Sequence, residues 1–209
     1  DSGIRALAEA INGGDGDRAL TVLDDPAFPD VTRLEPPEDN MAFDAIIRPL
    51  AANGYQRAVS VIDPAEGLNA LRSFRLLCAH RQGRRGVTYL NAEIEAWLAQ
   101  EGHLTVDQPW YLGRPVLVTR NGRHLGLYNG DVGVIQLGDD GEHRRAWFEG
   151  EEGLRDFNPV LIPEHDTVFA TTVHKSQGSE YEHVVVVLPQ EPGPLLTREL
   201  LYTAITRAS

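Results

Sequence analysis

The sequence predicts an α/β domain that is interrupted by a small antiparallel β unit. Apolar residues at helical spacing alternate with short apolar runs of strand length over the first hundred residues and again after Pro163. Between them, short β-rich runs alternate with Asn-Gly and Asp-Gly turn signals, which is typical of a small antiparallel sheet or barrel. The expected limits are 1–109 for the first part of the α/β domain, 110–165 for the β insert and 166–209 for the remainder.

The first part is expected to be mainly helical. Its helices are predicted at 4–11, 18–23, 41–52, 64–73 and 91–99, and a buried strand is predicted at 74–78. Asp63 and Pro64 form a helix start signal, with Asp63 as the cap and Pro64 at the first position. Residues 24–40 contain four of the 13 prolines and many acids, so we expect a loop there, with a strand near Val31.

The insert is expected to fold on itself and to touch the α/β domain mainly at its two ends. Its strands are predicted at 115–119, 132–137, 145–148 and 160–162. After it, the α/β pattern predicts strands near 168–172 and 184–188 and a helix at 197–207.

Charge and cysteine content limit the kind of protein. The formal net charge of −12 argues against coating of nucleic acid by the whole surface, although the five arginines within 72–85 allow a local basic channel. Cys78 is the only cysteine, so no internal disulfide framework and no Cys-based zinc site is expected. It stands in an apolar run, which favours a buried core residue and fits a reducing, cytoplasmic setting. The seven histidines are scattered without His-x-x-x-His spacing, so we expect no metal site.

Two segments carry candidate chemistry. The first, 171–180, reads Thr-Thr-Val-His-Lys-Ser-Gln-Gly-Ser-Glu between two apolar strands, where hydroxyls, cations and a glycine turn suit phosphate contacts. The second, 200–208, is a helix that ends on Arg207. A guanidinium offers bidentate donors to phosphate oxygens and keeps its charge, so Arg207 suits an arginine finger. Taken singly, each segment is as well explained by a capped polar loop and a solvated helix end.

Together the two segments resemble motifs V and VI of superfamily-one helicases. Their residues are most similar to the form these motifs take in the RecD family. Residues 74–91 look like motif IV, and the segment 125–133 resembles the family's SH3-like insert in the second motor domain. The resemblance covers roughly 73–208 well and is weaker over the first 60 residues. It implies a RecA-like motor domain carrying an SH3-like β-barrel, within an ATP-dependent 5′-to-3′ DNA helicase.

The resemblance also implies roles for individual residues. Arg81 and Arg207 would act on the nucleotide phosphates, and Gln177, Gly178 and Glu180 would bind the nucleotide, although Gln177 can touch either ligand. The residues implied near the DNA strand are Thr172, His174 and Ser176. From charge alone, we expect Arg120 and Arg123 to lie nearer the DNA track and the acidic edge within 139–156 to face solvent or a protein partner.

The sequence departs from a complete motor of this family. It contains no Gly-x-x-x-x-Gly-Lys-Ser/Thr and no apolar strand that ends in an Asp-Glu pair. We expect the P-loop and the Mg²⁺ ligands to precede Asp1, so that this chain supplies one wall of the ATP site. The implied partners are single-stranded DNA, the first RecA-like domain and the other two subunits of an exodeoxyribonuclease V-type helicase–nuclease complex for double-strand break processing and recombination.

Two other functions stay open at this point. One is a different superfamily-one helicase, such as a stand-alone RecD-like enzyme or a conjugative relaxase–helicase. The other is a non-motor scaffold that keeps the fold and has lost ATP hydrolysis; Gln177, Gly178, Glu180 and Arg207 argue against it, because a scaffold has no need of them.

Overall fold

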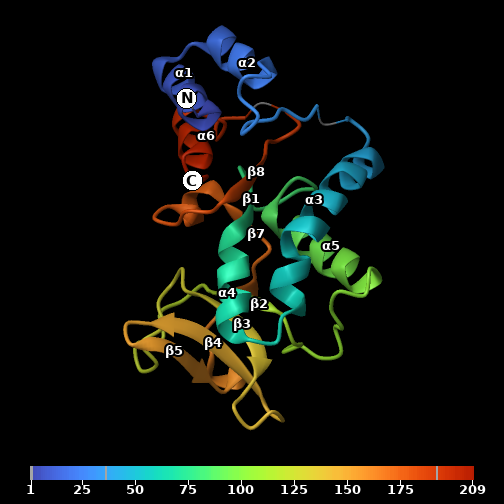
Figure 1. Ribbon diagram of the computed structural model, residues 1–209, viewed down its shortest axis with the longest axis vertical. Coiled ribbons are helices and arrows are strands. Elements are labelled where there is room, and N and C mark those ends of the chain that lie inside the picture. The colour runs from blue at the N-terminus through green and yellow to red at the C-terminus, as the bar shows by residue number, and fades with distance from the viewer. Residues whose placement is uncertain (1, 36, 192) are drawn as a thin grey trace. The chain divides into compact units, whose positions relative to one another are not determined.

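The computed structural model describes residues 2–35, 37–191 and 193–209 and separates into two compact units (Figure 1). The first unit is formed by residues 1–47, 75–90 and 170–209, and the second by 48–74 and 91–169. The second unit therefore contains the predicted insert together with helical residues that lie outside it in the sequence.

The first unit is built on a three-stranded sheet of order β7-β1-β8. Its strands are β1 (Phe74–Cys78), β7 (Ala170–Thr172) and β8 (His183–Val187). β1 and β7 run parallel, with Leu76 opposite Ala170. Every residue of β1 is buried, as expected for a central strand of apolar composition. The three predicted strands of the α/β domain are thus confirmed, with β7 shorter than expected.

Three helices accompany this sheet in the first unit: α1 (Gly3–Gly13), α2 (Gly16–Asp24) and α6 (Arg198–Ile205). α1 and α2 pack through an apolar cluster of Leu7, Ala10, Ala19 and Val22, which Ile205 of α6 also contacts. Figure 1 shows α1 and α6 side by side. The strand expected near Val31 is wrong: this proline-rich stretch forms no strand in its described residues.

Two long helices, α3 (Asn40–Ser60) and α5 (Val87–Gln100), contribute residues to both units. α3 continues eight residues beyond the predicted end at 52, past Gly54. Packing within the second unit explains this glycine, because a Cβ at position 54 would lie 2.2 Å from the Phe74 ring. The neighbouring Tyr55 packs edge-on against Phe74 and Phe169, with ring centroids 5.0 and 5.2 Å away. Tertiary packing therefore outweighs the helix cost of glycine.

α4 (Pro64–Ser73) begins as predicted. The side chain of Asp63 accepts a hydrogen bond from the Glu66 N–H at 2.9 Å, and Pro64 occupies the first turn, where its missing N–H costs nothing.

The second unit contains a five-stranded antiparallel sheet of order β5-β4-β3-β2-β6. Its strands are β2 (Pro115–Val118), β3 (Val132–Leu137), β4 (Arg144–Gly150), β5 (Gly153–Phe157) and β6 (His165–Thr167). The strand predicted at 160–162 is wrong, because Pro159–Leu161 is a 3₁₀ turn (η1) capped by the Asn158 side chain. The antiparallel insert is confirmed as a sheet, and its closure into an SH3-like barrel stays a prediction.

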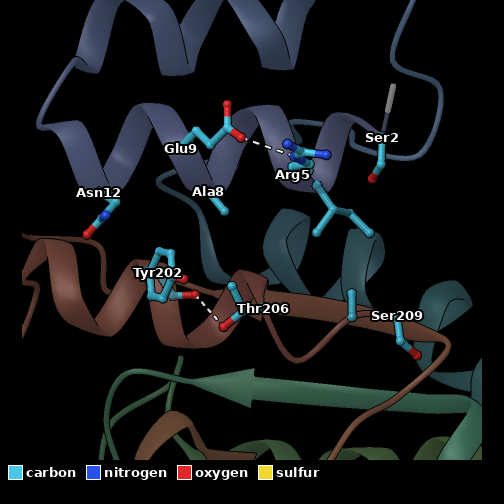
Figure 2. Close-up of a pocket in the computed structure, with 10 residues that line it drawn as sticks. Ser2, Arg5, Ala8, Glu9, Asn12, Tyr202, Thr206 and Ser209 are labelled. Atoms are coloured by element: carbon cyan, nitrogen blue, oxygen red, sulfur yellow. Dashed lines mark hydrogen bonds and ion pairs between the residues drawn. The ribbon is translucent and has the colours of Figure 1, made fainter.

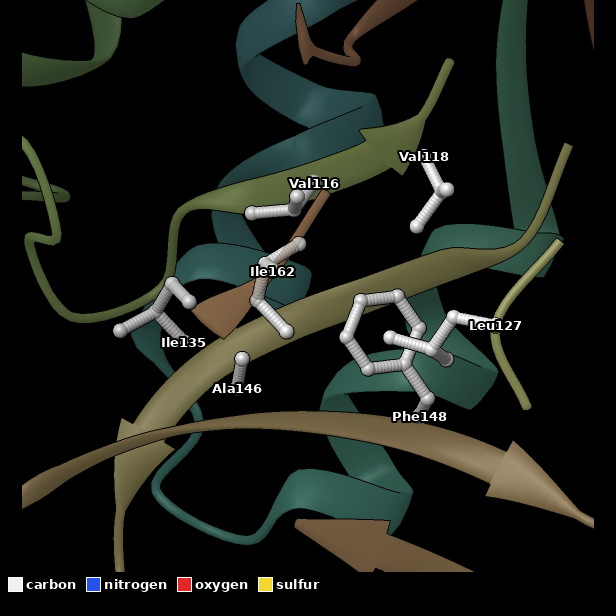
Figure 3. Close-up of a cluster of buried hydrophobic side chains, with 7 residues drawn as sticks. All are labelled: Val116, Val118, Leu127, Ile135, Ala146, Phe148 and Ile162. Atoms are coloured by element: carbon white, nitrogen blue, oxygen red, sulfur yellow. The ribbon is translucent and has the colours of Figure 1, made fainter. Parts of the chain in front are cut away.

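A compact apolar core lies under this sheet (Figure 3). It consists of Val116, Val118, Leu127, Ile135, Ala146, Phe148 and Ile162. The insert has an apolar core of its own, as expected, but the expectation that it touches the rest of the chain mainly at its two ends is wrong, because α4 packs on β3 within the second unit. Gln136 donates a hydrogen bond to the Val61 carbonyl at 2.7 Å, and Arg72 of α4 pairs with Glu149 of β4. A small sheet gains stability by burying surface against such neighbours.

Among the described residues, no helix combines the length and apolar character needed to cross a bilayer.

Candidate functional site

The loop after β7 is shaped by its own hydroxyl groups. It contains the 3₁₀ turn η2 (Val173–Ser176), which Thr172 caps by accepting a hydrogen bond from the Lys175 N–H at 3.3 Å. Ser176 is 1% exposed, and its Oγ donates to the Val173 carbonyl at 2.7 Å. His174 and Lys175 are exposed. The structure therefore gives Ser176 a role inside the loop, while His174 is presented to solvent.

The loop turns at Gly178, whose φ of +87° lies in the left-handed region that other residues rarely adopt. A Cβ at this position would meet no atom within 4 Å, so the dihedral angle alone requires glycine. The Ser179 N–H closes the turn on the Ser176 carbonyl at 3.0 Å. Gln177 and Glu180, on either side of the bend, are exposed.

Arg207 follows α6 and is fixed against this loop. Its Nε donates to the Thr203 carbonyl at 3.2 Å, and its Nη1 donates to the Ser179 carbonyl at 3.1 Å. Within the described residues no carboxylate pairs with Arg207, and its Nη2 has no partner. A guanidinium held at two points with one nitrogen uncommitted suits an anionic ligand.

Tyr181 joins the two segments through the backbone. Its N–H donates to the Arg207 carbonyl at 2.8 Å, and its carbonyl accepts from the Ser209 N–H at 3.0 Å. Beside it, the guanidinium of Arg75 in β1 lies 5.0 Å from the centroid of the Tyr181 ring and is 2% exposed. This cation–π contact anchors the end of the loop to the central strand. Neither residue was a predicted site residue, and only their pairing in space reveals the contact.

An apolar cluster supports both segments from below. It consists of Leu77, Ala79, Val173, Leu200 and Ala204, which come from β1 and the residue after it, from η2 and from α6. Because these side chains are buried together, the loop after β7 and the helix that precedes Arg207 pack on the same part of the core.

The basic run at 72–85 does not form one nucleic-acid surface. Arg75 is buried, Arg84 binds Asp44 at 2.7 Å, and Arg85 donates to the Pro37 carbonyl at 2.9 Å. Arg81 is exposed just beyond β1, and its carbonyl accepts the Thr88 N–H at 3.0 Å. These arginines are close together in the sequence, but in the folded chain they contact different partners.

The two remaining predicted residues lie in the second unit. Arg120 forms an ion pair with Glu164 at 2.8 Å, with 73% and 68% of the side chains exposed. Arg123 is exposed and has no side-chain partner in the described chain. Eight predicted site residues thus belong to the first unit and two to the second.

The interpretation of Cys78 as a core residue is confirmed, because the side chain is fully buried and burial raises the pKa of its thiol to about 12. In the described parts of the chain, no three His, Cys, Asp or Glu side chains lie together as a metal site would require.

An open groove of about 470 Å³ lies between α1 and α6 in the first unit (Figure 2). Arg5 and Glu9 pair with each other on one wall, and Tyr202 and Thr206 face them from the other. None of the predicted site residues lines it.

Comparison with known proteins identifies relatives of this chain. Residues 167–209 match the UvrD-like helicase C-terminal domain. The chain is 42% identical over 207 residues to the RecBCD enzyme subunit RecD of Mycobacterium tuberculosis, which covers 98% of this chain and 35% of that protein. It is 30% identical over 161 residues to the ATP-dependent RecD2 DNA helicase of Deinococcus radiodurans, covering 74% of this chain and 21% of that protein.

Among solved structures, Bacteroides Pif1 bound to single-stranded DNA is similar at a TM-score of 0.37 and 14% identity, over 85% of this chain and 49% of the other. The chain spans about a third of the length of the curated relatives it matches. Its match to RecD subunits runs over nearly its whole length and falls in their C-terminal part. The chain therefore belongs to the RecD family of helicases, as the counterpart of the C-terminal part of its members.

Proposed function

We propose that this chain is the C-terminal motor half of an ATP-dependent 5′-to-3′ DNA helicase. The observation that carries the proposal is the joining of the two motif segments: Arg207 donates to the Ser179 carbonyl, and Tyr181 pairs with the residues around Arg207. A change in the position of the loop is thereby transmitted to the arginine. Such coupling is what a motor needs in order to link nucleotide state to DNA movement.

The accessible residues of the site fit a nucleotide and a DNA strand on the same loop. Arg207 has an uncommitted nitrogen for a phosphate, Arg81 is an exposed cation, and Gln177, Gly178 and Glu180 form the exposed bend beside Arg207. Bound ATP would supply the phosphoanhydride bond whose hydrolysis drives the motor. The Mg²⁺ ligands are assigned to the first RecA-like domain, because this sequence has no P-loop and no apolar strand that ends in an Asp-Glu pair.

DNA contacts are proposed for accessible residues of the loop and of the insert. The half-buried Thr172 and the exposed His174 stand on the first unit, where a hydroxyl and an imidazole can donate to backbone phosphates. Arg120 and Arg123 stand on the second. Ser176 is proposed to hold the loop, because its hydroxyl is buried and already donates within it.

The proposed setting is a cytoplasmic helicase–nuclease complex of the exodeoxyribonuclease V type, acting in double-strand break processing and recombination. The M. tuberculosis relative is named a RecBCD enzyme subunit, and it matches a larger share of this chain at higher identity than the Deinococcus RecD2 helicase does. That difference favours a subunit with two partner chains over a stand-alone enzyme. The test is copurification of the full-length protein with its partners.

The arginine-finger role is tested by Arg207→Ala in the full-length protein. We expect ATP turnover to fall about 10³- to 10⁵-fold, or about 4–7 kcal/mol of transition-state stabilisation, with DNA affinity nearly unchanged. Arg207→Lys should rescue little, because an ammonium cannot hold Ser179 and Thr203 and contact phosphate at the same time. Normal DNA-stimulated turnover in Arg207→Ala would overturn the arginine-finger role of this residue.

A further inference from the structure

The thirteen-residue connection between β2 and β3 (119–131), which we name the β2–β3 turn, carries one exposed aromatic and two exposed basic side chains. Tyr128 is 55% exposed, and Arg123 and His124, which precede it by five and four residues, are also exposed. In the portion of the chain that the structure describes, none of these three side chains has a hydrogen-bond, ionic or ring partner. They are available to a ligand.

The backbone of the turn is closed on itself. Gly122 and Leu127 form an isolated antiparallel bridge, with N–O distances of 2.8 and 3.3 Å. Leu127 is 2% exposed and inserts into the core of the sheet beside Phe148 (Figure 3). The four residues between the bridged pair therefore form a tight turn with a buried anchor.

Neighbouring charged side chains brace the turn further. The guanidinium of Arg155 in β5 donates to the carbonyls of Leu125 and Gly126. The Asp131 carboxylate accepts the Tyr128 N–H at 2.8 Å. The backbone of the turn is therefore held at several points by hydrogen bonds from side chains outside and inside it.

We propose that the β2–β3 turn is a binding site for unpaired DNA, in which Tyr128 stacks on a base and Arg123 contacts a backbone phosphate. The proposal rests on the proposed helicase function, and it adds a base-stacking residue and a ligand conformation to it. Every base has a π-face, so an exposed aromatic binds single strands without regard to sequence. Bases in a duplex are stacked on one another and do not offer that face.

The hydrogen-bonded backbone and the charge of the turn both favour this occupant. A platform that is already ordered loses little conformational entropy on binding. Arg120 is paired with Glu164, whereas Arg123 has no carboxylate partner in the described chain. Arg123 can therefore form a phosphate contact without breaking an ion pair. Arg123 is therefore the stronger phosphate ligand of the two predicted arginines.

The test measures affinity of the full-length protein for a labelled oligo(dT) strand and for a strand of equal length made of abasic residues. Tyr128→Ala should weaken binding of oligo(dT) about 5- to 150-fold, which corresponds to about 1–3 kcal/mol for one stacked base. It should leave the abasic strand unaffected. Tyr128→Phe should restore oligo(dT) binding, whereas Tyr128→Leu should not, because leucine is apolar but has no π-face.

Arg123→Ala should weaken binding of both strands. It should also reduce the slope of log affinity against log salt concentration by about 0.7 for single-stranded DNA. Leu161→Ala is the matched control: Leu161 is 56% exposed in the same unit, and removing it should change neither affinity. All these side chains are exposed, so unchanged melting temperatures should accompany every effect.

Two readouts separate this proposal from the function on which it rests. If wild-type protein shows no DNA-stimulated ATP turnover, the helicase function is overturned, and the contrast between the two strands is still measured directly. If wild-type protein turns over ATP while Tyr128→Ala binds oligo(dT) normally, the base-stacking site alone is overturned. The base-stacking site is likewise overturned if Tyr128→Ala weakens only assembly with partner subunits, since the turn is then a protein contact.

Discussion

Individual residues of the site differ in what they contribute, and exposure separates the groups. Glu180 is exposed and Arg207 is half-buried, and both are proposed to bind a ligand, whereas Ser176 and Arg75 are buried and contact the loop itself. A buried arginine needs compensation for its lost hydration, and the Tyr181 ring provides part of it. The proposed site therefore combines accessible polar groups with buried side chains that hold the loop.

Gly178 is predicted to matter for turnover more than its size indicates. Gly178→Ala should cost about 1–2 kcal/mol of stability, because an L side chain strains the backbone at φ +87°. The displaced bend should also lower ATP turnover in the full-length protein, measured as kcat at saturating DNA.

The matched control is Gly141→Ala in the β3–β4 hairpin, where φ is +70° and a Cβ likewise meets no atom within 4 Å. It should cost similar stability and leave turnover unchanged. Equal loss of turnover in both variants would mean that strain anywhere lowers activity and that the Gly178 bend has no special role.

At the scale of elements, turns and caps show how side chains replace missing backbone partners. Asp63 caps α4, Thr197 caps α6 through the Leu200 N–H, and Asp140 closes the β3–β4 hairpin. Each has an acceptor oxygen aimed at N–H groups that lack a partner in the helix or ladder. Such elements can be predicted locally because donor and acceptor are only a few residues apart.

The hairpin closed by Asp140 is predicted to loosen in acid. Hydrogen bonds from the His143 and Glu142 N–H groups and from the His143 ring lower the pKa of Asp140 to about 2, against an ordinary value of 3.8. A depressed pKa means that the stabilisation is fully present above pH 3.8 and is lost as the pH falls toward 2.

Comparison of wild type with Asp140→Ala by denaturant unfolding should therefore show a stability difference at pH 7 that shrinks between about pH 4 and about pH 2. A difference that is constant over this range would contradict the role given to the carboxylate.

At the scale of the whole molecule, the relevant feature is the lack of a P-loop in the sequence. The chain carries Arg207 and the loop after β7, but its sequence has neither the P-loop nor an apolar strand that ends in an Asp-Glu pair. If the chain supplies one wall of an ATP site as proposed, a nucleotide bound to it alone would lack the P-loop that orients its phosphates.

We predict that the purified 209-residue chain neither hydrolyses ATP nor unwinds DNA, while the full-length protein does both. The assay is phosphate release with and without single-stranded DNA, with the Arg207→Ala chain as the background control. Release by the isolated wild-type chain that disappears in Arg207→Ala would contradict the division of the ATP site between two domains.

The sequence by itself determined the order and type of most elements and the two motif segments. Strand β1, the Asp63 cap and the bend at Gly178 all follow from residues that are neighbours in the chain, so their local pattern is sufficient. The resemblance to the RecD family was also inferred from the residues of these two segments, because a sequence motif is itself a local pattern.

The tertiary structure alone decided which polar residues are available and how far some elements extend. Gly54 within α3 leaves room for the Phe74 ring, so the glycine that locally favours a helix end is accommodated inside the helix. The exposed, charged β5 forms because β4 pairs with it. Arg84 forms an ion pair with Asp44, and Arg75 forms a cation–π contact with Tyr181, although the partners are far apart in the sequence. The physical reason is the same in each case: burial and pairing depend on partners brought together only by folding, and no local pattern records them.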